Sequence, residues 1–154
     1  MKFFTHQWWL DTQKGVFEDR HTAYADHVGR IRRRVPTDLL DLDGKLHDAT
    51  VTSIECNSDE RWLTFFVDGD REGELLQMRL TYHGVKGFTM TPNPDLGLLR
   101  TYGFGDLGYD EVDIDDTGAL VHRLLFATGI EVEVRFNAFE YRENEAASDQ
   151  PTHH

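Results

Sequence analysis

Two periodicities divide the chain, the first helical and the second strand-like. In the first part, apolar and ring-bearing residues recur at alternating spacings of four and three, which is one stripe of an amphipathic helix. This spacing predicts a helix from Phe17 to Arg34, which Pro36 ends because a residue before proline disfavours helical geometry. A helical turn over 37–44 completes a helical region over 1–44. The stripe consists of Phe17, His21, Tyr24, Val28, Ile31 and Val35.

From residue 46 onward apolar and polar residues alternate at every second position, the pattern of strands with one buried face. The alternation is cleanest over 130–138, where Ile130, Val132 and Val134 are expected to face inward. An apolar sheet face has to be covered, and the helix over 17–34 is long enough to cover it. We therefore predict an α+β fold in which N-terminal helices pack on a curved, mostly antiparallel sheet of about six strands. The strand-like ranges are 46–56, 61–67, 75–83 with its continuation 84–90, 109–115, 119–127 and 130–138.

Neither a linker nor an internal repeat divides the chain. We predict a single domain over 1–142, with a helical part over 1–44 and a sheet over 46–142. Polar and acidic residues make up 143–154, which is predicted to be a flexible tail. The glycine-rich range 97–108 is predicted to be an irregular connection, and its role stays open.

Acidic residues dominate the charge. Lys and Arg number 16 against 28 Asp and Glu, so the formal net charge is −12. Nucleic acids are not expected as partners, because their binding relies on basic residues that displace counterions from phosphates. The basic run Arg30–Arg34 is interpreted as the solvated end of a helix. An acidic protein suits a basic protein partner instead.

The N-terminus has no apolar signal segment, and the chain has no run of about 20 apolar residues that could span a bilayer. We therefore expect a cytoplasmic location and no membrane partner. The single cysteine, Cys56, lies in a strand-like range and is predicted to be a buried, inert thiol.

Two acidic turns, 68–73 and 113–118, reproduce the first half of a calcium loop, with oxygen-bearing residues at positions one, three and five and glycine at six. Position twelve is Arg79 in one and Leu124 in the other, where a calcium loop requires glutamate. We interpret both as hairpin turns and expect no metal site, while ion binding at them stays open.

No nucleophile elbow, phosphate-binding loop or dinucleotide fingerprint is present, so no cofactor and no catalytic residue is predicted. The carboxylates of Asp106, Asp110, Glu111 and Asp113 offer pairs for acid–base chemistry, but such runs are typical of a solvated rim. An enzyme is the less favoured interpretation.

Histidine and aspartate are adjacent at His47–Asp48, where the predicted sheet begins. In an extended strand their side chains point to opposite faces, so the pair is not expected to form a dyad. A structural role is favoured, with Asp48 accepting from backbone amides and His47 bonding to a neighbouring strand. The alternative is that His47, together with His83 or His122 from other strands, lines a small pocket.

Two adjacent tryptophans, Trp8 and Trp9, follow Thr5, which is predicted to cap a short helix, with Phe4 packed against Trp9 as a hydrophobic staple. Burial against the sheet is the favoured interpretation, because Trp is highly buried on average. An exposed pair would instead mark a partner site.

Three short motifs carry a resemblance to other proteins: Met1-Lys2-Phe3-Phe4-Thr5 with Trp8-Trp9, the central Leu46-His47-Asp48-Ala49, and Val134-Arg135-Phe136-Asn137-Ala138-Phe139-Glu140-Tyr141. In them the chain resembles an uncharacterised family of small bacterial cytoplasmic proteins. The Leu-His-Asp-Ala motif also resembles the entry into the sheet of some immunity proteins of bacterial toxin systems. Neither resemblance implies catalytic residues.

Three functional hypotheses follow. The leading one is a non-enzymatic protein-binding domain, and its finer form is an immunity-type inhibitor whose acidic surface engages a basic partner. The second is a small-molecule-binding or hydrolytic domain with a polar pocket between helix and sheet. The third is a structural subunit of an oligomer, and the oligomeric state stays open.

Overall fold

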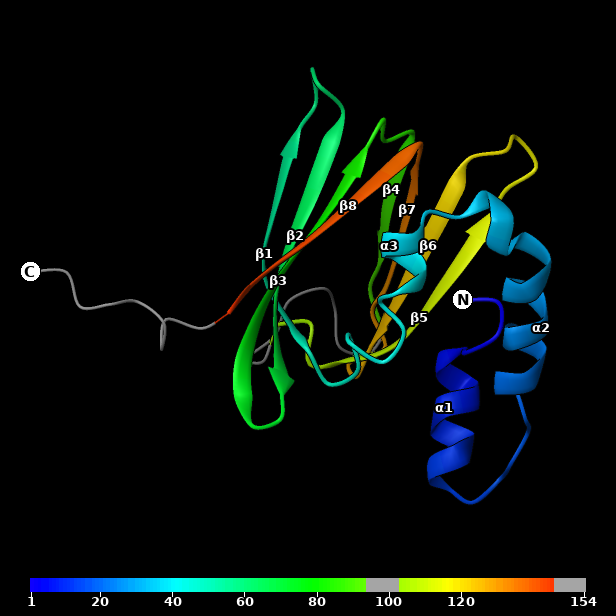
Figure 1. Cartoon of the computed structure of the whole chain (residues 1–154). Helices are drawn as coiled ribbons and strands as arrows, with labels where there is room; N and C mark the ends of the chain where they lie inside the picture. The colour runs from blue at the N-terminus through cyan, green and yellow to red at the C-terminus, as the bar shows by residue number, and fades with distance from the viewer. Residues whose placement is uncertain (94–102, 146–154) are drawn as a thin grey trace, which may run out of the picture.

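The computed structural model describes residues 1–93 and 103–145, which form two four-stranded antiparallel sheets and three short helices (Figure 1). The first sheet has the order β1-β2-β3-β8 and the second has the order β4-β7-β6-β5. The first sheet comprises β1 (Thr50–Asn57), β2 (Trp62–Arg71), β3 (Glu74–His83) and β8 (Ala138–Glu145). The second comprises β4 (Gly87–Thr91), β5 (Leu107–Ile114), β6 (Leu120–Phe126) and β7 (Glu131–Phe136). The helices are α1 (His6–Gln13), α2 (His21–Ile31), continued by a 3₁₀ turn (Arg32–Arg34), and α3 (Thr37–Leu40).

The predicted α+β class with antiparallel strands is confirmed, but the prediction of one sheet of about six strands was wrong. The chain passes from the first sheet to the second after β3 and returns to the first sheet between β7 and β8. These two crossings lie next to each other in space. Gly84 has a positive φ of 63° there, and the Asn137 N–H donates to the His83 carbonyl oxygen at 2.9 Å. A side chain on residue 84 would collide with Asn137, whose side-chain nitrogen lies 2.7 Å from the position of such a Cβ. The predicted continuation of the strand from 75–83 into 84–90 was therefore wrong, because the chain crosses from one sheet to the other at Gly84.

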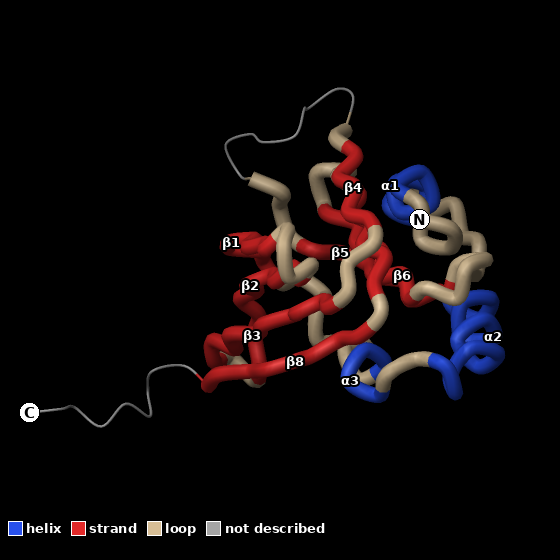
Figure 2. Tube along the Cα trace, turned by 90° about the horizontal axis from the view of Figure 1, so that it is seen from above, coloured by secondary structure: helices blue, strands red, loops and turns tan. Residues whose placement is uncertain are grey.

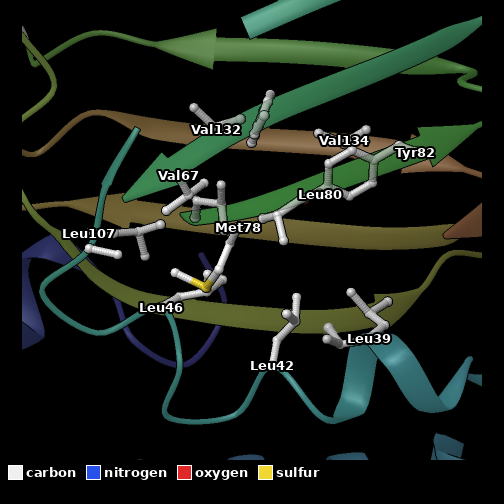
Figure 3. Close-up of a cluster of buried hydrophobic side chains, with 14 of the residues drawn as sticks. Leu39, Leu42, Leu46, Val67, Met78, Leu80, Tyr82, Leu107, Val132 and Val134 are labelled. Atoms are coloured by element: carbon white, nitrogen blue, oxygen red, sulfur yellow. The ribbon is translucent and has the colours of Figure 1, made fainter. Parts of the chain in front are cut away.

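The hydrophobic core lies between the two sheets, whose inward faces cover each other. Tyr82 of β3 contacts Phe136 of β7, with ring centroids 4.8 Å apart. One side of the core is filled by the chain around α3, from which Leu39 and Leu42 point toward the strands (Figure 3). The fully buried residues of this core include Leu39, Leu42, Leu46, Phe65, Leu80, Tyr82, Leu107, Leu124, Val134 and Phe136.

The predicted long helix is shorter and does not cover the core. It begins at His21 rather than Phe17, and α2 contains no buried residue. Phe17, the first residue of the predicted stripe, is 88% exposed. Because the second sheet covers the first, α2 rests on the outer part of the molecule beside β5 (Figure 1).

The N-terminal segment is attached to β5 by a buried carboxylate. Glu111 is 1% exposed, and its two carboxylate oxygens accept the backbone N–H groups of Lys2, Phe3 and Phe4 at 2.7–2.9 Å. This attachment places α1 and α2 on the same side of the molecule (Figure 2).

The last strand was missed. β8 pairs with β3 in a register that places Tyr141 opposite Leu80. It extends to Glu145, so the predicted tail boundary at residue 143 was wrong, because cross-strand pairing continues there. The rest of the predicted tail and residues 97–102 of the glycine-rich range lie outside the described residues. Among the described residues, no helix is long and apolar enough to cross a membrane.

Candidate functional site

A cleft of about 280 Å³ lies between α2, α3 and β5. Its apolar residues come from all three elements, whereas its polar residues come from the start of α2, the 3₁₀ turn after α2, the turn after α3 and one position on β5. The apolar lining is Ala25, Val28, Leu39, Leu40 and Val112, and the polar lining is His21, Tyr24, Arg32, Asp43 and Asp110.

Asp110 is the most strongly held polar group of the cleft. Its Oδ2 lies 2.8 Å from His122 Nε2, and His122 Nδ1 lies 2.6 Å from the Tyr82 hydroxyl. His122 is fully buried, whereas the Asp110 side chain keeps 20% of its surface exposed. The chain of hydrogen bonds thus runs from the core between the sheets to a carboxylate at the cleft.

The direction of these hydrogen bonds follows from the chemistry of the groups. A carboxylate oxygen accepts, so His122 Nε2–H donates to Asp110, and in the tautomer that carries its proton on Nε2 the Nδ1 atom accepts from the Tyr82 hydroxyl. Complete burial raises the pKa of Tyr82 well above its usual value, with a further contribution from the charge of Asp110, so the phenol keeps its proton. Tyr82 lies inside the core and is not accessible to a ligand. The chain therefore orients Asp110 and offers no accessible nucleophile.

Tyr24 forms the wall of the cleft contributed by α2. Its hydroxyl oxygen accepts the backbone N–H of Val112 at 2.8 Å, which ties α2 to β5. Burial raises the pKa of Tyr24, and the negative charge of Asp110 raises it further. Phe3 and Phe4 pack against the Tyr24 ring, with centroids 5.4 and 5.2 Å away. The ring is thus held in place from the N-terminal side.

A second polar group behind α2 keeps the helix against β5. Asp113 Oδ2 accepts from Arg123 at 3.1 Å and lies 2.9 Å from Lys2 Nζ, and Asp113 Oδ1 lies 3.1 Å from His27 Nε2. Burial raises the pKa of Asp113, but the hydrogen bonds from Lys2, the Ile114 N–H and Arg123 outweigh it and lower the pKa overall. Asp113 is therefore ionised at neutral pH, and its contacts with Lys2, Arg123 and the Ile114 N–H give it a structural role.

The remaining polar groups of the cleft are Asp43, Arg32 and His21. Asp43 and Arg32 are exposed, and neither forms an ion pair within the ranges that the structure describes. His21 contacts the Phe4 and Trp8 rings, with centroids 5.0 and 5.7 Å away. The cleft lining thus combines two carboxylates, one guanidinium and one imidazole with apolar side chains.

His47 and Asp48 lie in a turn before β1, not in a strand, so the argument that separated their side chains was wrong. Asp48 has a positive φ of 63°, and Asp48 Oδ1 lies 3.7 Å from His47 Nε2. His47 Nδ1 donates to the Gly108 carbonyl oxygen at 2.9 Å, which agrees with the predicted bond to a neighbouring strand. Both side chains are more than half exposed. They connect the start of the first sheet to the edge of the second.

The structure does not bring His47, His83 and His122 together in one pocket. His83 is exposed on β3, with its Nε2 3.6 Å from Glu140 Oε2. His122 is buried inside the core. Of the three, His122 alone is linked to the cleft, through Asp110.

Trp8 and Trp9 pack against β5. Trp8 is 7% exposed, and its Nε1–H donates to the Glu18 carbonyl oxygen at 2.7 Å. Thr5 caps α1 as predicted and accepts from the Trp8 N–H. Phe4 packs on Trp8, with ring centroids 5.4 Å apart, so the predicted staple to Trp9 was wrong. Trp9 is half-buried and packs against Gly108 and Tyr109.

Cys56 is exposed on β1, an edge strand, so its predicted burial was wrong. Cys56 lies opposite Leu63, whose side chain is buried in the core, so strand alternation does not account for its exposure. Both predicted turns lie between hairpin strands, but their bounds were wrong: residues 68–71 belong to β2 and 113–114 to β5, so the connections are 72–73 and 115–119. In the second turn, Asp115 Oδ1 accepts from the Thr117 and Ala119 N–H groups, and Oδ2 accepts from Arg135.

The sequence interpretation missed Asp43 and Tyr24 and assigned Asp110 to a solvated rim. One signal was present: Asp110 shares a strand face with Val112 and Ile114, which alternation predicts to be the covered face. A carboxylate on a covered face needs a partner, and here the partner is His122. Among the described residues, no cluster of three or more His, Cys, Asp or Glu has the arrangement of a metal site.

Comparison of the chain with protein-family models and with curated proteins finds no match. The site is therefore interpreted from its own geometry.

Proposed function

We propose that this chain is a non-enzymatic protein-binding domain that engages a basic partner through the face bearing the α2–α3–β5 cleft. The observation that carries the proposal is Asp110, whose carboxylate is fixed at the cleft by the buried His122–Tyr82 chain. A carboxylate held in advance loses little side-chain entropy when a cation binds it.

Charge and exposed apolar surface support the same proposal. A net charge of −12 would steer a basic protein toward the domain and speed its association. Val16 and Phe17 are 60% and 88% exposed on the loop before α2, flanked by Glu18 and Asp19. Exposed aromatic residues with an acidic rim are typical of surfaces that other proteins bury.

The finer form of the proposal is an immunity-type inhibitor that acts in the cytoplasm on a basic toxin domain. It rests on the Leu46-His47-Asp48-Ala49 resemblance and on the acidic charge. Nucleic acid and membrane are not part of the proposal.

The test is capture of a partner by the C-terminally tagged chain, followed by binding measurements with the purified partner. We expect a basic protein whose association slows by about tenfold or more as ionic strength rises from low to high. Charge reversal at Asp38 and Asp41, two exposed residues of the α3 region, should also slow association. Reversal at Asp59, in the β1–β2 turn, is the matched control and should change it little. An association rate that changes neither with ionic strength nor with charge reversal at Asp38 and Asp41 would count against the proposal.

A second candidate is the binding of a small zwitterionic molecule in the same cleft. The observation that favours it is Arg32, which brings a positive charge to a lining that also holds Asp43 and Asp110. A thermal-shift screen with amino acids and related zwitterions tests it. A stabilising hit that is lost in both Arg32→Gln and Asp110→Asn would favour this candidate over the first.

A further inference from the structure

We infer that the cleft between α2, α3 and β5 is an anchor pocket for one long basic side chain, lysine or arginine, of a protein partner. The inference rests on the proposed function, because it names the group through which the partner is held. It adds a residue-level site and a ligand chemistry.

The size of the cleft favours a single side chain. Its volume is about 280 Å³, just below the range of roughly 300–1,000 Å³ typical of pockets that enclose a drug-sized molecule. Pockets that receive a central anchor residue at protein interfaces enclose one side chain.

The lining matches the two parts of a basic side chain. Lysine and arginine carry an apolar stem and a charged head, and the stem packs on apolar surface while the head reaches polar groups. Val28, Leu39 and Val112 provide apolar surface, and Asp110 and Asp43 provide carboxylates in the same lining.

Asp110 is suited to the head group because only one side of its carboxylate is engaged by the protein. Oδ2 accepts from His122, and among the described residues no donor bonds to Oδ1. Charge-assisted hydrogen bonds to such an oxygen are stronger than neutral ones. The buried His122–Tyr82 chain keeps the carboxylate from turning away.

The positive charge of Arg32 allows the charge of the ligand to be tested. Its guanidinium lines the cleft and repels a cation, whereas it would attract the carboxylate of a zwitterion or an anionic group. Removing it should therefore strengthen the binding of a basic side chain and weaken that of an anionic or zwitterionic ligand.

The experiment titrates the full chain with Nα-acetyl-lysine amide and Nα-acetyl-arginine amide, which mimic a residue within a partner chain, followed by amide NMR shifts. Nα-acetyl-norleucine amide, which keeps the stem without the charge, is the ligand control. We expect shifts around Tyr24, Val28 and Val112 with a dissociation constant on the order of 1–10 mM, and much weaker binding of the norleucine compound.

Three variants complete the test. Asp110→Asn should weaken binding about tenfold or more, while its amide oxygen still accepts from His122. Asp59→Asn removes the same charge in the β1–β2 turn, outside the lining, and should leave binding unchanged. Ala25→Trp fills the cleft without changing charge and should abolish binding. The melting temperature of each variant shows whether it is folded.

The inference is overturned if the shifts fall outside the cleft, if folded Asp110→Asn and Ala25→Trp bind as the wild type does, or if Arg32→Gln weakens binding. These outcomes differ from a failure of the proposed function. A basic partner that binds Asp110→Asn and Ala25→Trp with wild-type affinity would leave the protein-binding proposal standing and refute the anchor pocket.

Discussion

At the scale of single residues, carboxylates that sequence analysis treats alike have three different roles on one strand. Asp110 faces the cleft and bonds to His122, Glu111 is buried against the N-terminal amides, and Asp113 pairs with Arg123 on the other face of β5. Strand alternation separates Asp110 from the other two. A run of acidic residues interpreted as a solvated rim is therefore mostly internal.

Glu111→Gln should destabilise the fold. The glutamine side chain offers one acceptor oxygen and one N–H group in place of the two oxygens that accept from Lys2, Phe3 and Phe4. At least one buried amide then loses its partner, which costs about 1–3 kcal/mol of unfolding free energy. Urea denaturation followed by tryptophan fluorescence measures it.

The matched control for that variant is Glu55→Gln, because Glu55 is an exposed glutamate on β1. Its effect should stay within about 0.5 kcal/mol. Equal stability of the two variants would contradict the role given to Glu111.

At the scale of elements, the Trp9 indole of α1 packs on the Gly108 backbone of β5 and holds the helix against the second sheet. Gly108 of β5 lies under the Trp9 ring, and a Cβ at that position would lie 2.4 Å from the Trp9 ring carbon Cη2. The turn at His47 also reaches Gly108, through its carbonyl oxygen. One glycine thus joins the N-terminal helix, the entry to β1 and the edge of the second sheet.

Gly108→Ala should displace Trp9, because no side chain fits at that distance. We expect a loss of about 1–3 kcal/mol and tryptophan emission shifted toward longer wavelength as the indole becomes more exposed to water. Denaturation curves and emission spectra of the folded protein measure the two effects.

Gly29→Ala is the control within α2, where a Cβ would meet nothing within 4 Å. A helix interior gains about 0.5–1 kcal/mol from this change, so the variant should be equally or more stable. If Gly108→Ala were as stable as Gly29→Ala, the close packing of Trp9 would be wrong.

At the scale of the whole molecule, ion pairs and hydrogen bonds lower the pKa of several carboxylates, including Asp115. The Thr117 hydroxyl lowers the pKa of Asp115 most, and Arg135 and the backbone N–H groups of Ala119 and Thr117 add to the effect. The same direction holds for Asp113, Glu140 and Glu143.

A lowered pKa in the folded state means that the unfolded chain binds more protons in acid. The stability from these groups is present above their unfolded pKa values, about 3.9 for Asp and 4.3 for Glu, and is lost as the pH falls through the folded values. Urea denaturation should give similar unfolding free energies at pH 7 and pH 5 and a clear decrease below about pH 4.

Asp115→Asn serves as the check on that dependence. The variant should be less stable than the wild type at pH 7 and should lose less stability on acidification, because one of the responsible groups is gone. If the unfolding free energy of this variant fell with pH as steeply as that of the wild type, Asp115 would not contribute to the loss of stability in acid.

The sequence by itself determined the antiparallel α+β class and the inward residues of the central strands. Over β7 the residues Val132, Val134 and Phe136 are buried as their alternation predicts, because side-chain direction in a strand is a local property of the backbone. The Thr5 cap of α1 is local in the same way.

Only the tertiary structure decided how many sheets form and where the cleft lies. The bond between Tyr82 and His122 joins residues 40 positions apart, and that between Lys2 and Glu111 joins residues 109 apart. Strand order depends on which distant segments pair, and one sequence does not encode that order in any local pattern. The crossings at Gly84 and Asn137 therefore turned one predicted sheet into two, moved α2 off the core and left Asp110 at the cleft.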